Sequence, residues 1–147
     1  MRERWDIGAE IGRGGGGVVY AGAHRRTGFP VAIKRAPVGA GMLAEAAAVA
    51  RISHPFVVTI LDFGTTEDGA FLVMERAAET LAAVLPTLSW GQVRTVLLRL
   101  LDGLAAVHEA GLVHLDLKPT NVLLGCRRSP HEPRLGPLDG LRLADFG

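Results

Sequence analysis

Apolar and polar residues alternate in short runs through the first half of the chain. Two such runs, residues 18–24 and 29–36, flank the turn sequence Arg-Arg-Thr-Gly, and two more, residues 56–64 and 69–75, surround Thr-Thr-Glu-Asp-Gly. Short apolar runs separated by Gly-containing turns are typical of β-hairpins. The first half is therefore predicted to form a small, mostly antiparallel sheet.

Two segments have helical features instead. Residues 41–52 are Ala-rich and are predicted to form a helix that ends before His54-Pro55, because the residue before a proline disfavours the α conformation. Residues 89–92 read Ser-x-x-Gln, a capping box that predicts the start of a longer helix, and Gly111 follows its predicted end. This helix has an apolar stripe at three- and four-residue spacing, made up of Val93, Val96, Leu97, Leu100, Leu101 and Leu104.

The last third of the chain has few regular elements. Residues 111–125 are predicted to form a loop and a short strand, and residues 141–145 a final strand. Between them, residues 126–140 are rich in Pro, Gly and Arg and are expected to form a surface loop.

Composition narrows the class of protein. The chain has 147 residues, 48% of them apolar, and a formal net charge of +1, so it lacks the basic excess that attracts nucleic acid or anionic membranes. A single cysteine, Cys126, excludes an internal disulfide and fits a reducing compartment. The N-terminus has no apolar signal core, and no apolar run reaches the roughly 20 residues of a membrane-spanning helix. We expect a cytoplasmic chain without nucleic-acid or membrane partners.

A glycine-rich stretch follows the first predicted strand, with the pattern Gly12-x-Gly14-x-x-Gly17-x-Val19. Glycines let backbone N–H groups approach phosphate oxygens closely, although such a stretch can also be a simple flexible turn. A dinucleotide fingerprint would require a helix directly afterwards, and a Walker A loop would require Gly-Lys-Ser/Thr. The chain has neither, which favours a hairpin folded over the phosphates of a nucleotide.

Lysine is rare in this chain. Fourteen of its basic residues are arginine and only two are lysine, Lys34 and Lys118. A lysine in an apolar strand is often an edge residue whose ammonium reaches solvent. In an arginine-rich sequence, however, a lysine marks a position where a compact ammonium differs in effect from a planar guanidinium. Lys34 lies in Val-Ala-Ile-Lys, after the glycine-rich hairpin, and Lys118 lies in the next motif.

The third motif is His-Leu-Asp-Leu-Lys-Pro-Thr-Asn, residues 114–121. Pro-Thr-Asn is ordinary turn chemistry, and Asp116 could be a turn aspartate. Yet the spacing places a carboxylate, the Lys118 ammonium and the Asn121 amide in one short loop. A fourth motif, Asp-Phe-Gly, ends the chain at residues 145–147.

These four motifs, in this order, resemble those of the protein kinase family, and Lys118 in Asp-Leu-Lys-Pro-Thr-Asn resembles its bacterial-type serine/threonine branch. The resemblance covers residues 5–147 and implies an α+β, protein-kinase-like fold. Residues 1–78 would form the small lobe, an antiparallel β-sheet with one helix (helix C), the glycine-rich loop and the hinge. Residues 79–147 would form the first part of a mainly helical large lobe, with helices D and E, the catalytic loop and Asp-Phe-Gly.

The resemblance implies that ATP is bound by residues of both predicted lobes. Residues 12–19 would cover the phosphates, and Lys34 would contact the α- and β-phosphates with Glu45 as its acidic partner. The predicted ATP-binding set is Ile11, Gly12, Arg13, Gly14, Gly15, Gly16, Gly17, Val18, Val19, Ala32, Lys34, Glu45, Met74, Glu75, Ala77 and Leu123.

For the adenine, the resemblance implies contacts with Val19 and Ala32 on one face and Leu123 on the other. Met74 would be the gatekeeper, and the backbone of residues 75–77 would be the hinge that hydrogen-bonds the adenine edge.

The resemblance also assigns the chemistry. Asp116 would be the catalytic base that orients the substrate hydroxyl, and Lys118 would steady the transferring phosphoryl group. Asn121 and Asp145 would supply oxygen ligands to Mg²⁺, a hard cation. His114 is expected to pack rather than to take part in chemistry.

Two features depart from the family's pattern. Leu115 stands where an arginine normally precedes the catalytic aspartate, so control by phosphorylation of an activation segment is not expected. The stretch between Asn121 and Asp145 is longer than usual.

The family continues after Asp-Phe-Gly with an activation segment, a docking platform and helices that cover the apolar stripe. Leaving about five aliphatic side chains half-covered would forfeit roughly 1 kcal/mol each, against the roughly 5–15 kcal/mol that stabilises a whole domain. We therefore expect the chain to be marginally stable, aggregation-prone or completed by another polypeptide, with a truncated reading frame as the simplest origin.

Three functions compete at this stage. The leading one is an ATP-dependent protein kinase that phosphorylates serine or threonine of a protein substrate. The second is a non-catalytic ATP-binding module, similar to a pseudokinase, that acts through a partner. The third is a small-molecule kinase of the antibiotic- or choline-phosphorylating type, which rarely combines the glycine hairpin, Val-Ala-Ile-Lys and Asp-Leu-Lys-Pro.

Overall fold

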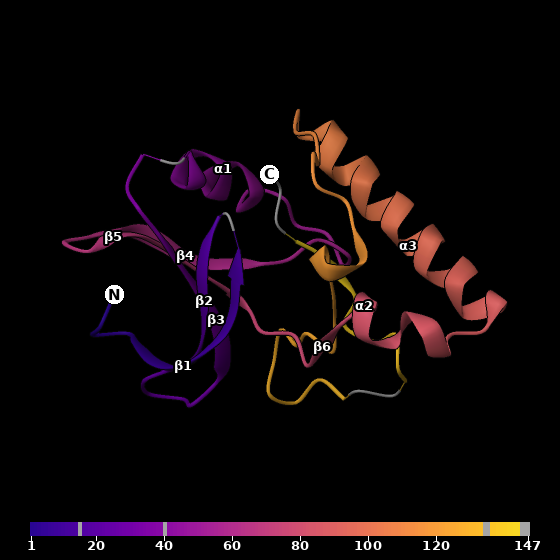
Figure 1. Cartoon of the computed structure of the whole chain (residues 1–147), viewed down its shortest axis with the longest axis horizontal. Helices are drawn as coiled ribbons and strands as arrows, with labels where there is room; N and C mark the ends of the chain where they lie inside the picture. Colours follow the sequence, from indigo (N-terminus) through magenta and orange to yellow (C-terminus); the bar gives the residue numbers. More distant parts are fainter. Residues whose placement is uncertain (15, 40, 134–135, 145–147) are drawn as a thin grey trace. The chain divides into compact units, whose positions relative to one another are not determined.

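A computed structural model describes residues 1–14, 16–39, 41–133 and 136–144 (Figure 1). The chain divides into two compact units. Unit 1 contains residues 1–51 and 59–76, and unit 2 contains residues 52–58 and 77–147. Each unit has its own architecture, and together they confirm the predicted α+β class.

Unit 1 is built on a five-stranded sheet in the order β1-β2-β3-β5-β4, with antiparallel pairing throughout. Both predicted hairpins are present, β2–β3 and β4–β5. The strands are β1 (Trp5–Gly14), β2 (Gly17–His24), β3 (Pro30–Ala36), β4 (Ile60–Thr66) and β5 (Gly69–Glu75).

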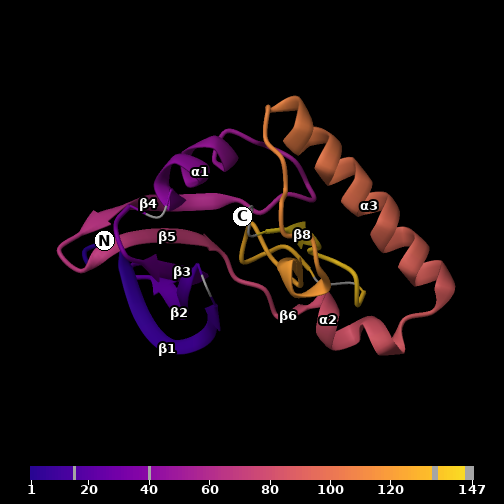
Figure 2. The ribbon, with the colours of Figure 1, turned by 45° about the horizontal axis from the view of Figure 1, so that its top comes forward.

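One face of this sheet is packed on apolar side chains. Val31 and Ile33 of β3 and Val73 of β5 are fully buried, as expected for central strands. Trp5 joins this cluster and donates its indole N–H to Asp62 Oδ2 at 2.8 Å. Helix α1 (Met42–Val49) packs against β4 and β5 (Figure 2).

The segment between α1 and β4 differs from the prediction. The helix ends at Val49, earlier than the predicted residue 52, and β4 begins at Ile60 rather than at Phe56. Residues 52–58 belong to unit 2, where Leu143 N–H donates to the Phe56 carbonyl at 2.8 Å and Val58 N–H donates to the Leu143 carbonyl at 3.0 Å. The predicted strand 56–64 is therefore wrong in its first residues, because their backbone groups pair instead with strand β8 (Arg142–Leu143).

Unit 2 contains a three-stranded sheet of short strands in the order β6-β7-β8, together with one long helix, α3. The short loop and strand predicted at residues 111–125 and the final strand are present. The elements are β6 (Glu79–Thr80), α2 (Leu81–Val84), η1 (Leu85–Thr87), α3 (Trp90–Glu109), η2 (Pro119–Asn121), β7 (Val122–Leu124) and β8 (Arg142–Leu143).

Both ends of α3 are fixed by the predicted caps. Ser89 Oγ accepts from Gln92 N–H at 3.2 Å, and Gln92 Oε1 accepts from Ser89 N–H at 2.8 Å, which completes the capping box. At the other end Gly111 has φ of 80°, and Leu112 N–H donates to the Val107 carbonyl at 3.1 Å. This left-handed glycine with a six-to-one bond is a Schellman motif.

The apolar residues of α3 divide between two faces. Leu100 and Val107 are buried, and Gly103 lets the backbone of Phe56 approach the helix. Leu97 and Leu101 of the predicted stripe are 50% and 62% exposed. The prediction that part of this stripe is uncovered is therefore confirmed for the described residues. Among these residues, no helix has both the length and the apolar character needed to cross a membrane.

The two faces of α3 can be compared with adjacent leucines. Leu100→Ala is expected to lower the free energy of unfolding by about 2–5 kcal/mol, because Leu100 is 8% exposed and its loss leaves a cavity. Leu101→Ala, the matched control at 62% exposure, should cost about 0.5 kcal/mol or less. Urea unfolding followed by circular dichroism measures both, and equal costs would contradict this assignment of faces.

Candidate active site

The glycine-rich stretch forms the tip of the β1–β2 hairpin. Gly14 and Gly17 are the last paired residues of the two strands. Gly17 has φ of 128°, and a Cβ there would lie 2.2 Å from the Arg35 carbonyl oxygen. No other residue fits this position, so the close approach of the hairpin to β3 depends on glycine.

Lys34 lies on β3, the strand that pairs with β2 of this hairpin. In the sheet it pairs with Val19 on one side and with Leu72 on the other. A Cβ built on Gly16 would lie only 2.8 Å from Lys34 Nζ, so the ammonium sits against the glycine backbone. Unit 1 thus brings a positive charge and a side-chain-free backbone together, which is the chemistry an anion requires.

The remaining predicted ATP-binding residues of unit 1 lie on the same sheet or on α1. Ala32 and Met74 are paired neighbours on β3 and β5, and both are buried. Glu45 is in the first turn of α1. The Arg13 guanidinium bonds Glu10 at 2.8 Å, so its side chain is already engaged within β1.

Other predicted ATP-binding residues lie at or beyond the boundary between the units. The predicted hinge, residues 75–77, spans the point where the chain passes from unit 1 to unit 2. Leu123 lies on β7, between Thr80 of β6 and Arg142 of β8. Gly15 is outside the described residues.

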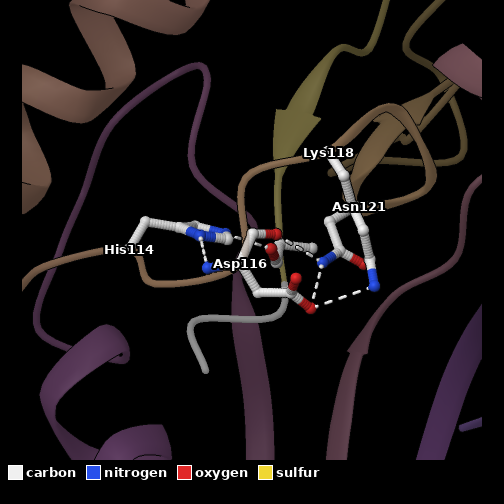
Figure 3. Close-up of polar contacts among 5 residues, drawn as sticks. His114, Asp116, Lys118 and Asn121 are labelled. Carbon is white, nitrogen blue, oxygen red and sulfur yellow. Dashed lines mark hydrogen bonds and ion pairs between the residues drawn. The ribbon is translucent and has the colours of Figure 1, made fainter.

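The catalytic-loop motif forms a hydrogen-bonded cluster in unit 2 (Figure 3). Lys118 Nζ lies 3.1 Å from Asp116 Oδ2. Asn121 Nδ2 donates to the same oxygen at 3.2 Å and to the Asp116 carbonyl at 2.8 Å. The predicted carboxylate, ammonium and amide therefore converge on one another, with Pro119–Asn121 forming the 3₁₀ turn η2 that brings Asn121 back.

His114 ties this loop to the end of β8. Its Nδ1 accepts from Asp116 N–H at 3.1 Å, so in the neutral ring Nε2 carries the proton and donates to the Ala144 carbonyl at 2.7 Å. Ala144 N–H in turn donates to the Asn121 carbonyl at 3.0 Å. The sequence predicted a packing role for His114; the structure adds that it fixes the backbone of the catalytic loop.

Asp116 is held as an acceptor. The pKa of its carboxyl is lowered from the usual value, first because Lys118 donates a hydrogen bond to it, with the Lys118 charge and the Asn121 hydrogen bond acting in the same direction. Partial desolvation acts in the opposite direction. The side chain is 53% exposed, so it can still receive a donor from solution.

The donor set fits a hard cation in part. Both side-chain hydrogen bonds of Asn121 leave from Nδ2, so Oδ1 is the end of the amide that could ligate a metal. Asp145, the other predicted ligand, lies outside the described residues, as do Phe146 and Gly147. Within the described part of the chain there is no cluster of three or more His, Cys, Asp or Glu side chains that could hold a metal.

A separate cavity of about 230 Å³ lies in unit 2, between α3 and the loop that connects β7 to β8. None of the predicted site residues lines it. The cavity is lined by Phe56, Arg99, Gly125, Cys126, Arg127, Glu132, Pro133, Asp139 and Gly140.

Comparison with known protein families identifies the family to which this chain belongs. The family described as "Protein kinase domain" matches residues 5–147. The chain belongs to the protein kinase family. The resemblance inferred from the four motifs is thereby confirmed.

The relatives of this protein kinase chain include bacterial proteins. It is 39% identical over 139 residues to serine/threonine-protein kinase Pkn1 of Myxococcus xanthus, covering 88% of this chain and 20% of that protein. It is 38% identical over 136 residues to serine/threonine-protein kinase pkn2 of the same organism, covering 85% of this chain and 16% of that protein. It is 30% identical over 149 residues to cell division control protein 2 homolog 2 of Trypanosoma brucei brucei, covering 94% and 40%. The chain spans a fifth or less of the length of these two bacterial relatives.

The lowered pKa of Asp116 gives a direct test of the cluster. Lys118→Met should raise the Asp116 pKa towards its ordinary value, because the largest contribution to the shift is removed. Since a lowered folded-state pKa stabilises the fold above the unfolded pKa, that contribution is lost as the pH falls through the folded pKa. In the variant this contribution should be smaller, and its loss should be complete at a higher pH.

Carboxyl ¹³C chemical shifts followed between neutral and acidic pH measure this pKa in both proteins. Arg35→Met is the matched control, since it removes a cation whose partner is Asp68 at 3.1 Å. An Asp116 titration that is the same in the Lys118 variant as in the wild type would contradict the assigned cause.

Proposed function

We propose that the chain is the catalytic part of a serine/threonine protein kinase that transfers the γ-phosphate of Mg-ATP to a hydroxyl group of a protein substrate. The observation that carries this proposal is the convergence of Lys118 and Asn121 on the Asp116 carboxylate. The serine/threonine-protein kinase names of its Myxococcus relatives support the substrate class.

Phosphoryl transfer asks the protein mainly for positioning and charge neutralisation. In this proposal Asp116 accepts the hydrogen bond of the substrate hydroxyl and aims its oxygen at the γ-phosphorus. Its lowered pKa suits this role, because the group stays ionised at neutral pH. Lys118, whose Nζ lies 3.1 Å from Asp116 Oδ2, would also neutralise charge on the transferred phosphoryl group.

Residues of unit 1 would bind the phosphates of the nucleotide. Lys34 and the glycine backbone around Gly16 would bind phosphate oxygens, with Glu45 as the predicted partner of the lysine. When bound, Mg²⁺ would neutralise phosphate charge, held by Asn121 Oδ1 and, as predicted from the sequence, Asp145. The proposal assigns residues 1–78 to the small lobe and residues 79–147 to the large lobe of the kinase. It also gives the protein a cytoplasmic location.

Replacing the Asp116 carboxylate tests phosphoryl transfer separately from ATP binding. Asp116→Asn should lower the rate of phosphoryl transfer by roughly 10²–10⁴-fold, because the amide cannot accept the hydroxyl proton, while ATP affinity stays within about threefold. Asp68→Asn, at an exposed carboxylate in the β4–β5 turn, is the control and should retain wild-type transfer.

Transfer is measured with radiolabelled ATP and a generic basic protein, and ATP affinity by calorimetry. Nucleotide binding without transfer in the wild-type chain would favour the non-catalytic module over the kinase. Phosphorylation of a small aminoglycoside or choline in place of protein would favour the small-molecule kinase.

The contact between Gly16 and Lys34 gives a second prediction. Gly16→Ala should weaken ATP binding by roughly threefold to tenfold, because the new methyl group occupies the place of the ammonium and displaces it from the phosphates. The flexible lysine can move, so the fold should be retained. Gly91→Ala, where the nearest atom to a new Cβ is Ser89 Oγ at 3.9 Å, is the control. Unchanged ATP affinity in the Gly16 variant would contradict this role of the contact.

A further inference from the structure

The long connection between β7 and β8, residues 125–140, is named the excursion, and the structure describes all of it except residues 134–135. Strands joined in a hairpin usually need only two to five loop residues. The base of the excursion is closed by Gly125 N–H to the Asp139 carbonyl at 2.8 Å and Cys126 N–H to the Gly140 carbonyl at 3.1 Å. Gly140 has φ of 66°, and a Cβ there would lie 2.3 Å from the Cys126 oxygen, so this closure requires glycine.

Arg128 attaches the excursion to the 52–58 segment. Its Nη2 donates to the His54 carbonyl at 2.6 Å and to the Val57 carbonyl at 3.2 Å. Its own backbone N–H donates to Glu132 Oε2 at 2.8 Å, which fixes the residue within the excursion. One charged group thus bonds two main-chain acceptors that lie outside regular secondary structure.

Arg99 of α3 makes a second attachment to the same two elements. Its Nη1 donates to the Leu138 carbonyl at 3.0 Å, and its guanidinium carbon lies 5.5 Å from the centre of the Phe56 ring. Leu138 is buried. The excursion is therefore attached near both of its ends. Arg128 joins it to the 52–58 segment, and Leu138 joins it to α3.

The 52–58 segment is in turn bonded to the catalytic loop through β8. Phe56 and Val58 exchange backbone hydrogen bonds with Leu143 on either side of the Val57–Leu143 bridge. The next residue, Ala144, bonds Asn121 through its N–H and His114 through its carbonyl. Hydrogen bonds of 2.6–3.2 Å inside unit 2, linked by the backbone of residues 54–58 and 143–144, therefore connect Arg128 with the residues around Asp116.

We infer that Arg128 is a positioning residue for phosphoryl transfer: by clamping the 52–58 segment it fixes β8, and through β8 the catalytic loop. The effect on transfer rests on the proposed function, while the clamp itself is a property of unit 2 alone. The neighbouring Arg127 does not contribute to this clamp, because it has no hydrogen bond or ion pair within the described residues.

Amide hydrogen exchange measured by NMR tests the clamp without nucleotide. In Arg128→Ala, exchange at the amides of Val58, Leu143 and Ala144 should be roughly threefold to tenfold faster than in the wild type. Arg127→Ala, the matched loss of one charge in the same loop, should stay within about twofold of the wild type.

Kinetics test the positioning role. Arg128→Ala should lower kcat by roughly threefold to tenfold while KM for ATP stays within about twofold, because the catalytic loop is loosened whereas Lys34 and Gly16, which are proposed to bind the phosphates, are unchanged. Arg128→Lys, which keeps the charge but not the planar fork, should give an intermediate kcat.

Wild-type exchange at Leu143 and Ala144 in Arg128→Ala would overturn the inference, as would equal effects of the Arg127 and Arg128 substitutions. Should the alanine variant not fold, Arg128→Gln, which keeps the aliphatic stem, makes the same comparison. Absence of transfer activity from a protein that contains this chain and the rest of the kinase domain would contradict the proposed function, and the exchange experiment would still decide the clamp. Faster exchange together with unchanged kcat would overturn the positioning role.

Discussion

The backbone hydrogen bonds of Leu143 and Ala144 are the constraint on which the candidate site depends. Both residues are buried, and a buried peptide group without a partner costs free energy, so their N–H and carbonyl groups must be bonded. Leu143 bonds the 52–58 segment, and Ala144 bonds Asn121 and His114. Leu143 and Ala144, at and directly after the end of β8, therefore tie the largely exposed catalytic loop to the 52–58 segment.

Features of the chain that are set by local interactions could be predicted from the sequence. The capping box at Ser89, the glycine end of α3 and the two hairpins of the sheet depend on residues a few positions apart, and all are present. The cluster of Asp116, Lys118 and Asn121 belongs to the same class, because one short loop contains all three. Its geometry was therefore accessible from spacing alone.

Pairing between distant segments could not be predicted. Residues 56–58, Phe-Val-Val, are aromatic or β-branched, which fits a strand of the first sheet as well as the observed pairing with β8. Periodicity describes which face of a segment is apolar but not which partner covers it. Arg128 shows the same limit, since its two carbonyl partners lie more than seventy positions earlier in the chain. From the sequence, Arg128 was expected only to lie in a surface loop, and the fold shows what it bonds.

The different surroundings of the two tryptophans have a spectroscopic consequence. Trp5 is enclosed in the sheet of unit 1, whereas Trp90, at the start of α3 in unit 2, is 78% exposed. Indole fluorescence shifts to longer wavelength when the ring meets water, and Trp90 is already hydrated in the native state. A red shift on denaturation therefore reports the opening of unit 1, whereas helical ellipticity comes mainly from the 20-residue α3 of unit 2.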